Sequence, residues 1–277
     1  MKHSLLSILP FLLLLPSGLA GATPKDHVVS VDGAWKIQFH GDIQADDAKK
    51  IGALLNSWNS TMNQHDADAV AKLHTNEATI RGSIYTVAAY RDKEAKAFKK
   101  HSDFKQDPAK DVYVTQLPTK NGYYLVFDES FTQSKKSSTA EIAIVVIREG
   151  DEYKIDYESD LSTDRGLLKK MGESVPTAPT NCVDLKKQIL MESPAFRYQY
   201  VSMYTQLSKD KTLSVVCDED ECMFAENEYS QATHLSFDLS AMTMTDSDFR
   251  SLAGVNYDPV YAIHPKYAKQ IEKLCKE

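Results

Sequence analysis

The sequence predicts an α+β fold in which a curved antiparallel sheet packs on three helices and is followed by a small disulfide-containing α+β unit. Three observations predict it. Apolar residues recur at intervals of three and four between 45 and 100, apolar and polar residues alternate between 111 and 159, and all four cysteines lie beyond residue 180. Helices followed by long antiparallel strands are typical of a layered α+β domain.

The N-terminal segment predicts export. It begins with Lys2, continues as an apolar run from Leu5 to Leu15, and ends in small residues at Ala22. The apolar run is shorter than the roughly twenty residues that a membrane-spanning helix needs. We therefore expect a signal peptide over residues 1–22 and a mature protein that does not span the membrane and is periplasmic or secreted.

Composition disfavours several classes of partner and chemistry. The chain carries 39 acidic against 32 basic residues, a formal net charge of -7, and no basic stripe that could neutralise phosphates. It contains no His-Glu-x-x-His, no Gly-x-Ser-x-Gly and no glycine-rich phosphate loop. We therefore expect no nucleic-acid partner, no metal and no cofactor.

The first helix is predicted between Ala45 and Asn63. Its apolar residues lie on one helical face: Ile51, Leu54, Leu55, Trp58 and Met62. Asp66 is suited to cap the short helix that follows it. Val87 to Lys100 predicts a third helix with a basic outer face.

Four β-rich runs with a period of two follow the helices: Asp111–Leu117, Tyr123–Gln133, Thr139–Arg148 and Tyr153–Ser159. The segments between them are short and rich in turn residues, as hairpin loops are. We therefore expect an antiparallel meander whose curved sheet wraps the helices and leaves a pocket at its open end.

The residues from Trp58 to Ile80 resemble the opening of the nuclear transport factor two-like superfamily. There, a helix with an aromatic residue is followed by an Asp, a short helix and a first strand, and here Trp58 and Asp66 hold those places. The strands Tyr124–Gln133 and Glu152–Glu158 are similar to those of the accessory domain of some bacterial L,D-transpeptidases. The resemblance covers about residues 45–162, and it implies a cone-shaped sheet, an envelope setting and, through an exposed sheet face, a homodimer.

The same resemblance provides a test for enzymatic groups. The ketosteroid isomerases of the superfamily use a general-base Asp just after the first strand and a Tyr on the first helix. Matching through Asp66 and Ala78 puts Gly82 and Trp58 at those two places. Glycine cannot accept a proton and an indole N–H is a poor substitute for a phenol, so isomerase chemistry of this kind is disfavoured.

Polar residues of the expected cone are candidate binding groups: Trp58, His74, Asp156 and Glu158. His74 with Glu77, or Asp156 with Glu158, is an alternative catalytic pair near the mouth of the cone. Alternation along the last strand predicts, however, that Asp156 and Glu158 share a solvated face with Lys154. We therefore assign no catalytic residue.

A boundary near residue 178 is predicted because residues 172–181 contain two prolines and no apolar periodicity. The expected domains are 23–178 and 179–277. The second is expected to contain a helix at Val183–Met191, strands at Tyr198–Leu207, Leu213–Val216, Met223–Tyr229 and Thr233–Leu239, and a closing helix at Pro265–Cys275.

The four cysteines predict two disulfides, because an even number in an exported protein is most simply paired. Four cysteines allow three pairings. We favour Cys217 with Cys222 and Cys182 with Cys275, the second joining the start of the C-terminal unit to its end. Zinc is the alternative, and the long gaps between the cysteines disfavour it.

The loop between Cys217 and Cys222 is acidic throughout and holds four candidate binding residues: Asp218, Glu219, Asp220 and Glu221. A calcium site is disfavoured because the alternating spacing and central glycine of a calcium loop are missing. The remaining alternatives are a disulfide-pinned turn whose charges keep the hairpin soluble, and an acidic surface for a cationic partner.

Two classes of function remain. The first, which we favour, is a non-catalytic envelope binding or adaptor protein whose partner is a protein or a small apolar ligand. The second is an enzyme that uses the cone as a pocket, as polyketide-cyclase-like relatives do; an inhibitor or immunity protein for an exported partner is a further alternative. Buried titratable groups within hydrogen-bond reach inside the cone would favour an enzyme, and an apolar cone would favour binding.

Overall fold

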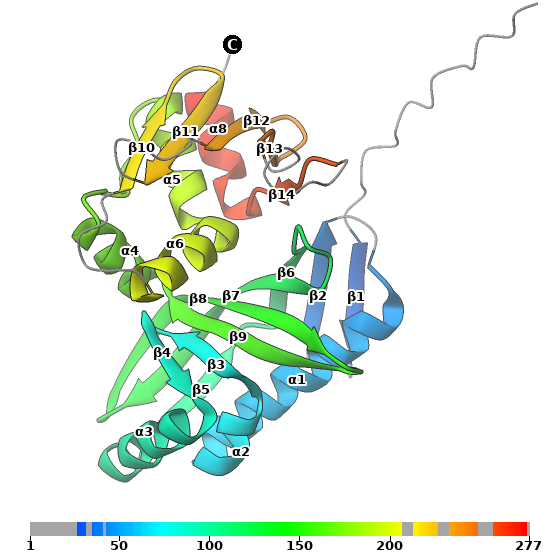
Figure 1. Ribbon diagram of the computed structural model, residues 1–277, viewed down its shortest axis with the longest axis vertical. Helices are drawn as coiled ribbons and strands as arrows, with labels where there is room; N and C mark the ends of the chain where they lie inside the picture. The colour runs from blue at the N-terminus through cyan, green and yellow to red at the C-terminus, as the bar shows by residue number, and fades with distance from the viewer. Residues whose placement is uncertain are drawn as a thin grey trace, which may run out of the picture.

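The computed structural model describes residues 27–31, 35–40, 43–206, 213–226, 233–248 and 257–275. The predicted signal peptide, residues 1–22, lies outside them. The described strands form one sheet of nine and one of five, and helices pack on both (Figure 1). The predicted α+β class is therefore confirmed. None of the helices in these ranges is both long enough and apolar enough to cross a membrane.

The first sheet and its helices occupy the described residues up to 170. The strands are β1 (His27–Val31), β2 (Trp35–His40), β3 (His74–Ile80), β4 (Ser83–Thr86), β5 (Lys105–Pro108), β6 (Asp111–Gln116), β7 (Gly122–Gln133), β8 (Lys136–Glu149) and β9 (Glu152–Asp160). The helices are α1 (Ala45–Gln64), α2 (Ala67–Lys72), α3 (Val87–Lys100) and α4 (Leu161–Lys170).

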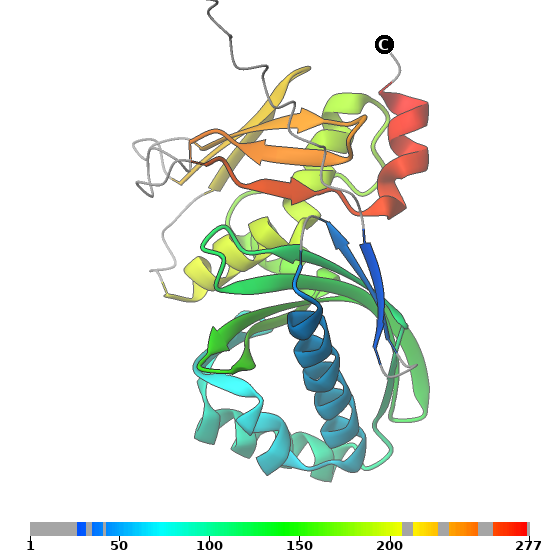
Figure 2. The ribbon, with the colours of Figure 1, turned by 90° about the vertical axis from the view of Figure 1, so that its right-hand side faces the viewer.

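The sheet order is β1-β2-β6-β7-β8-β9-β3-β4, with β5 paired to β7. Strands β6 to β9 form the antiparallel meander that the sequence predicts. Parallel pairing of β2 with β6 and of β3 with β9 extends the meander on both sides. The sheet curves around α1, which lies on its concave side (Figure 2).

Helix α1 lies in the concave sheet because its apolar face matches the inner side of the strands. The five residues predicted to share that face are all buried. They join one cluster with inward-facing strand residues such as Leu125, Phe127 and Ile155. The Asp66 carboxylate accepts from the Ala69 backbone N–H and caps α2, as predicted.

The second sheet belongs to the C-terminal part of the chain, which begins after residues 171–181, where no helix or strand forms. Its strand order is β10-β11-β12-β13-β14. The elements are α5 (Cys182–Glu192), α6 (Pro194–Gln206), β10 (Leu213–Cys217), β11 (Glu221–Glu226), β12 (Thr233–Asp238), β13 (Thr243–Asp246), β14 (Val260–Ala262), η1 (Pro265–Tyr267) and α8 (Ala268–Leu274). The division near residue 178 stays a prediction.

The strand predicted at Tyr198–Leu207 is wrong, because residues up to 206 belong to helix α6. Pro194 opens the helix, and the Ser193 hydroxyl accepts from the Phe196 backbone N–H. Phe196 and Tyr200, four residues apart, pack into the core of the second unit, while Tyr198 packs on the first sheet. A helix with apolar contacts on opposite sides lacks the one-sided stripe that identifies a helix in sequence.

The outer face of the first sheet is covered by the C-terminal elements. Tyr124, Val145 and Tyr157 on that face form one cluster with Tyr198 of α6 and Tyr261 of β14. The expectation of a homodimer was based on an exposed sheet face. That face is occupied within the chain, and the oligomeric state stays a prediction.

Both predicted disulfides form: Cys182 bonds to Cys275, and Cys217 bonds to Cys222. The first closes a separation of 93 residues and the second a separation of only 5. Because a disulfide restricts the unfolded chain more when its loop is long, the two are expected to contribute unequally.

Replacing Cys182 and Cys275 together by serine is expected to lower the free energy of unfolding by about 2–4 kcal/mol. The matched control is the pair Cys217→Ser and Cys222→Ser, which opens the short loop and should cost less. Urea unfolding of the three proteins measures both losses. Equal losses would contradict the loop-length argument.

Candidate functional site

Three of the predicted binding residues meet inside the cone. Trp58 from α1 donates its indole N–H to Glu158 Oε2 of β9 at 3.1 Å, and His74 Nε2 from β3 lies 3.3 Å from the same oxygen. All three side chains are buried. The cone therefore contains buried titratable groups within hydrogen-bond reach, a feature of enzymes, but here the three side chains are hydrogen-bonded to one another.

The surroundings of His74 locate a shared proton. Its Nδ1 lies 2.9 Å from the Val70 carbonyl oxygen, which is only an acceptor, so Nδ1 carries a proton and donates. Its Nε2 faces Glu158, so one further proton lies between the imidazole and the carboxyl group. Burial opposes ionisation of Glu158, but the hydrogen bond and charge of His74, with Arg81, hold the pKa of Glu158 below its ordinary value. Glu158 is therefore ionised at neutral pH.

A β-bulge places Glu158 in the cone. Val146 pairs with Ile155 but Val145 pairs with Tyr157, so Asp156 is an extra residue in β9. The predicted alternation from Lys154 is broken there. Glu158 consequently turns inward, and the expectation that it lies on a solvated face is wrong.

Asp156 stays outside the cone. Its carboxylate accepts from the Tyr198 hydroxyl at 2.6 Å and from the Thr75 hydroxyl at 2.9 Å. It joins the sheet to α6, so the structure does not bring it together with Glu158. The predicted pair of Asp156 with Glu158 is therefore absent.

A cavity of about 120 Å³ opens beside Glu158. Residues of α3, the β3–β4 turn and the segment after α3 line it, including Arg81, Tyr90, Lys93, Glu94, Phe98 and Phe104. Glu158 Oε2 accepts both bonds from Trp58 and His74, and no described residue bonds to Oε1. One carboxylate oxygen is therefore available to a bound molecule.

Arg81 lines the same cavity from the β3–β4 turn. It is exposed, and its φ of 48° is uncommon for a residue with a side chain. Its backbone N–H donates to the Glu158 carbonyl oxygen at 2.8 Å, which joins the turn to β9. Among the described residues its guanidinium has no ion-pair partner. Arg81 and Gly82 form the two-residue loop between paired Ile80 and Ser83, and positive φ at both positions is the geometry of a type I′ hairpin turn.

Gly82 follows Arg81 in this turn, also with positive φ (72°). A Cβ built at Gly82 would lie 2.3 Å from Leu167 Cδ1 of α4. A side chain at the position matched to the base of ketosteroid isomerases would therefore meet Leu167 and adopt a φ that favours glycine. The carboxylate of this cone is supplied by the last strand instead.

Glu129 is a second buried carboxyl group of the cone interior. It follows Phe127 by two residues on β7, so it shares the inward face, and its Oε1 has no hydrogen-bond partner among the described residues. Burial, with the charge of Glu158, raises the pKa of Glu129 to about 8. Glu129 is therefore neutral at pH 7 while Glu158 is ionised.

The acidic loop lies in the C-terminal unit, at the β10–β11 turn. Asp218 Oδ1 accepts from the backbone N–H groups of Asp220 and Glu221, and Lys186 donates to the Glu219 carbonyl oxygen. These bonds, with the Cys217–Cys222 disulfide, form a pinned turn. The role of the exposed carboxylates of Asp218–Glu221 as a contact surface stays a prediction. Among the described residues, no group of three or more His, Cys, Asp or Glu side chains is placed to hold a metal ion.

Arg81, Tyr90 and Glu129 line or neighbour the cone cavity and were not predicted from the sequence. A signal was present for Glu129, since it is the one acidic residue in the apolar alternation Tyr123, Leu125, Phe127, Glu129, Phe131. Arg81 has a weaker signal, its position before Gly82 in a tight turn. Tyr90 is indistinguishable in sequence from an ordinary core aromatic of α3.

Comparison with known proteins gives structural neighbours. No protein-family model and no curated protein sequence matches the chain. Solved structures match it over less than half of its length, with descriptions that name an NTF-2-like or a cystatin-like fold. This is the fold predicted for residues 45–162.

Three of the matching structures show the extent of the similarity. Bd1075 from Bdellovibrio bacteriovorus is 14% identical with a TM-score of 0.36, over 43% of this chain and 44% of its own. The NTF-2-like protein of unknown function from Shewanella oneidensis is 15% identical with a TM-score of 0.33, over 41% of this chain and 98% of its own. A domain of unknown function with a cystatin-like fold from Nostoc punctiforme is 12% identical with a TM-score of 0.38, over 48% of this chain and 90% of its own. The match with Bd1075 thus spans less than half of that protein.

Proposed function

We propose that the protein is an exported two-domain binding protein whose cone cavity holds a small zwitterionic molecule. Export is supported by the character of residues 1–22 and by the two disulfides, which form and persist in oxidising compartments. The ligand class is supported by the two charged groups that face the cavity.

The observation that carries the proposal is that Glu158 and Arg81 line one cavity, where no described residue bonds to Glu158 Oε1 and the Arg81 guanidinium forms no close ion pair with a described residue. The two opposite charges also act on each other at longer range. Glu158 suits an ammonium or hydroxyl donor, and Arg81 suits a carboxylate. Lys93 lies 3.1 Å from Glu94, so these two charges compensate each other. The volume of about 120 Å³ is below the roughly 150 Å³ of a cavity that holds benzene, so the cavity suits the charged end of an amino acid whose side chain extends through the opening.

This assignment predicts a preference that titration calorimetry can measure. Leucine, which is a zwitterion at neutral pH, should bind more tightly than two singly charged analogues. These are isoamylamine, which lacks the carboxylate, and isocaproate, which lacks the ammonium group. Arg81→Gln should weaken leucine binding by about 10- to 100-fold, the usual effect of removing a charge-assisted hydrogen bond.

The matched control is Arg91→Gln, which neutralises an arginine of α3 whose side chain pairs with Asp92 and does not line the cavity. It should leave leucine binding unchanged. Equal affinities for leucine and its singly charged analogues, or equal effects of the two variants, would rule out a zwitterion site on Arg81 and Glu158.

A second candidate function is acid–base catalysis in the cone, where Glu158 lines the cavity and Glu129 is a further buried carboxyl group. It is favoured by the opposite protonation states of Glu129 and Glu158, because two carboxyl groups whose pKa values are pushed apart can serve as acid and base. Exchange of the leucine Cα proton for deuterium, followed by NMR in heavy water, distinguishes the two functions. Exchange that the wild-type protein catalyses and Glu158→Gln does not would identify an enzyme. Absence of exchange with the wild-type protein would favour the binding function.

A further inference from the structure

A second cavity, of about 260 Å³, lies between the first sheet and the C-terminal unit. Tyr113 and Tyr124 line it from the outer face of the sheet, and Ile189, Met244, His264 and Tyr267 line it from the opposite side. It shares no lining residue with the cone cavity. Pockets between structural units are frequent ligand sites.

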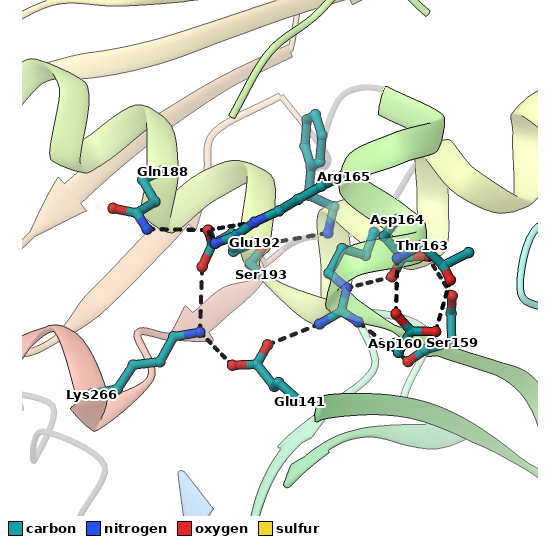
Figure 3. A network of polar contacts seen from close by, with 12 residues as sticks. Glu141, Ser159, Asp160, Thr163, Asp164, Arg165, Gln188, Glu192, Ser193 and Lys266 are labelled. Carbon is teal, nitrogen blue, oxygen red and sulfur yellow. Dashed lines mark hydrogen bonds and ion pairs between the residues drawn. The ribbon is translucent and has the colours of Figure 1, made fainter. Parts of the chain in front are cut away.

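The charged groups around this cavity are already paired. Lys266 donates to Glu141 and to Glu192, and Glu192 also accepts from Arg165 and Gln188 (Figure 3). The network leaves no charge for a ligand to compensate. A charged ligand would therefore lose its hydration without gaining a counter-ion.

His264 provides a hydrogen-bond donor. Burial lowers the pKa of His264 to about 4, so the ring is neutral at pH 7. Its Nδ1 accepts from the Lys266 backbone N–H at 3.0 Å, so the ring proton lies on Nε2. No described residue accepts from that Nε2–H.

Tyr124 provides a second donor. Its side chain is buried, and no described residue forms a hydrogen bond with its hydroxyl. Burial raises the pKa of Tyr124, so the hydroxyl keeps its proton. Because Tyr124 lines the cavity, its hydroxyl can donate a hydrogen bond to an oxygen of a bound ligand.

We propose that this cavity binds an uncharged, apolar two-ring molecule that carries a carbonyl oxygen. Aromatic and aliphatic side chains on both walls suit the rings, and the donors His264 Nε2–H and Tyr124 O–H suit the oxygen. The volume exceeds the roughly 150 Å³ that holds a single benzene ring. The paired charges exclude an anionic or cationic ligand.

The test uses 1-tetralone, an uncharged two-ring ketone, with tetralin as the hydrocarbon that lacks the oxygen and 1-naphthoate as the anionic analogue. Amide NMR spectra of the mature protein report where each probe binds. 1-Tetralone should shift residues 264–268 and bind about tenfold more tightly than tetralin, and 1-naphthoate should not bind. Tyr124→Phe should lower the affinity for 1-tetralone nearly to that for tetralin, and it should leave the affinity for tetralin unchanged.

Tyr85→Phe is the matched control, because it deletes a hydroxyl from a half-buried tyrosine that does not line the cavity. It should change neither affinity. The proposal is overturned if 1-tetralone causes no shift at millimolar concentration, if its shifts appear only around the cone cavity, or if Tyr124→Phe binds 1-tetralone and tetralin with the wild-type ratio.

Discussion

Replacing Arg197 by leucine is expected to lower the free energy of unfolding by about 3–5 kcal/mol. The side chain is fully buried, and its Nε donates to Asp164 Oδ2 at 2.6 Å. Asp164 is equally buried, so the substitution leaves a carboxylate inside the protein without its counter-ion. The cost of that unpaired charge, rather than the loss of one bond, accounts for the size of the effect.

The same arginine joins separate parts of the fold. Its other nitrogens donate to Glu141 of β8 and to the Ser159 carbonyl oxygen of β9, while the arginine itself lies on α6. Glu141 also accepts from Lys266 of η1, so the network continues into the C-terminal unit (Figure 3). Loss of Arg197 should therefore loosen the contact between the units as well as lower stability.

Chemical denaturation measures the loss of unfolding free energy, and two further variants serve for comparison. Arg91→Leu makes the same change at a half-exposed ion pair with Asp92, where solvent screening leaves only a small expected effect. Arg197→Lys keeps the positive charge but cannot donate to Asp164, Glu141 and the Ser159 carbonyl oxygen together. Its loss of unfolding free energy should therefore lie between those of Arg91→Leu and Arg197→Leu. A loss for Arg197→Leu as small as that for Arg91→Leu would show that the pair contributes no more than a surface ion pair.

Much of the fold was predictable because long periodic segments were identified correctly. Helix α1 repeats its apolar positions on one face from Ile51 to Met62, and β6 to β9 alternate over long runs, so local pattern and tertiary packing agree. Helix α6 was not predicted because its aromatic residues face both sheets, which removes the one-sided apolar pattern. The short strands β13 and β14 have too few residues for a pattern to form.

The site was predictable only in part. Trp58 and His74 were identified as polar or aromatic residues of the cone wall, and the structure brings both to Glu158. Glu158 was assigned to the wrong face because a single extra residue, Asp156, inverts the direction of every side chain after it. A bulge depends on pairing with strands distant in sequence, so local alternation does not reveal it.

Replacing Glu129 by glutamine is expected to stabilise the protein increasingly as the pH rises from about 4.5 to about 8. Burial raises the pKa of Glu129 from 4.5 to about 8 in the folded protein. A group with a raised pKa contributes stability that is fully present below its unfolded pKa and is lost as pH rises through its folded pKa. Glutamine keeps the shape of the neutral acid and does not ionise, so it avoids that loss.

The expected gain at pH 8 is roughly 3–5 kcal/mol, because each pKa unit corresponds to about 1.4 kcal/mol. Urea unfolding of the wild type and of Glu129→Gln at several pH values gives the difference directly, and Glu149→Gln, at an exposed glutamate, is the matched control. At pH 4 the wild type and Glu129→Gln should have similar free energies of unfolding. If their unfolding free energies ran parallel from pH 4.5 to pH 8, Glu129 would be ionised in the folded cone, and it could not supply the proton that acid–base catalysis beside Glu158 requires.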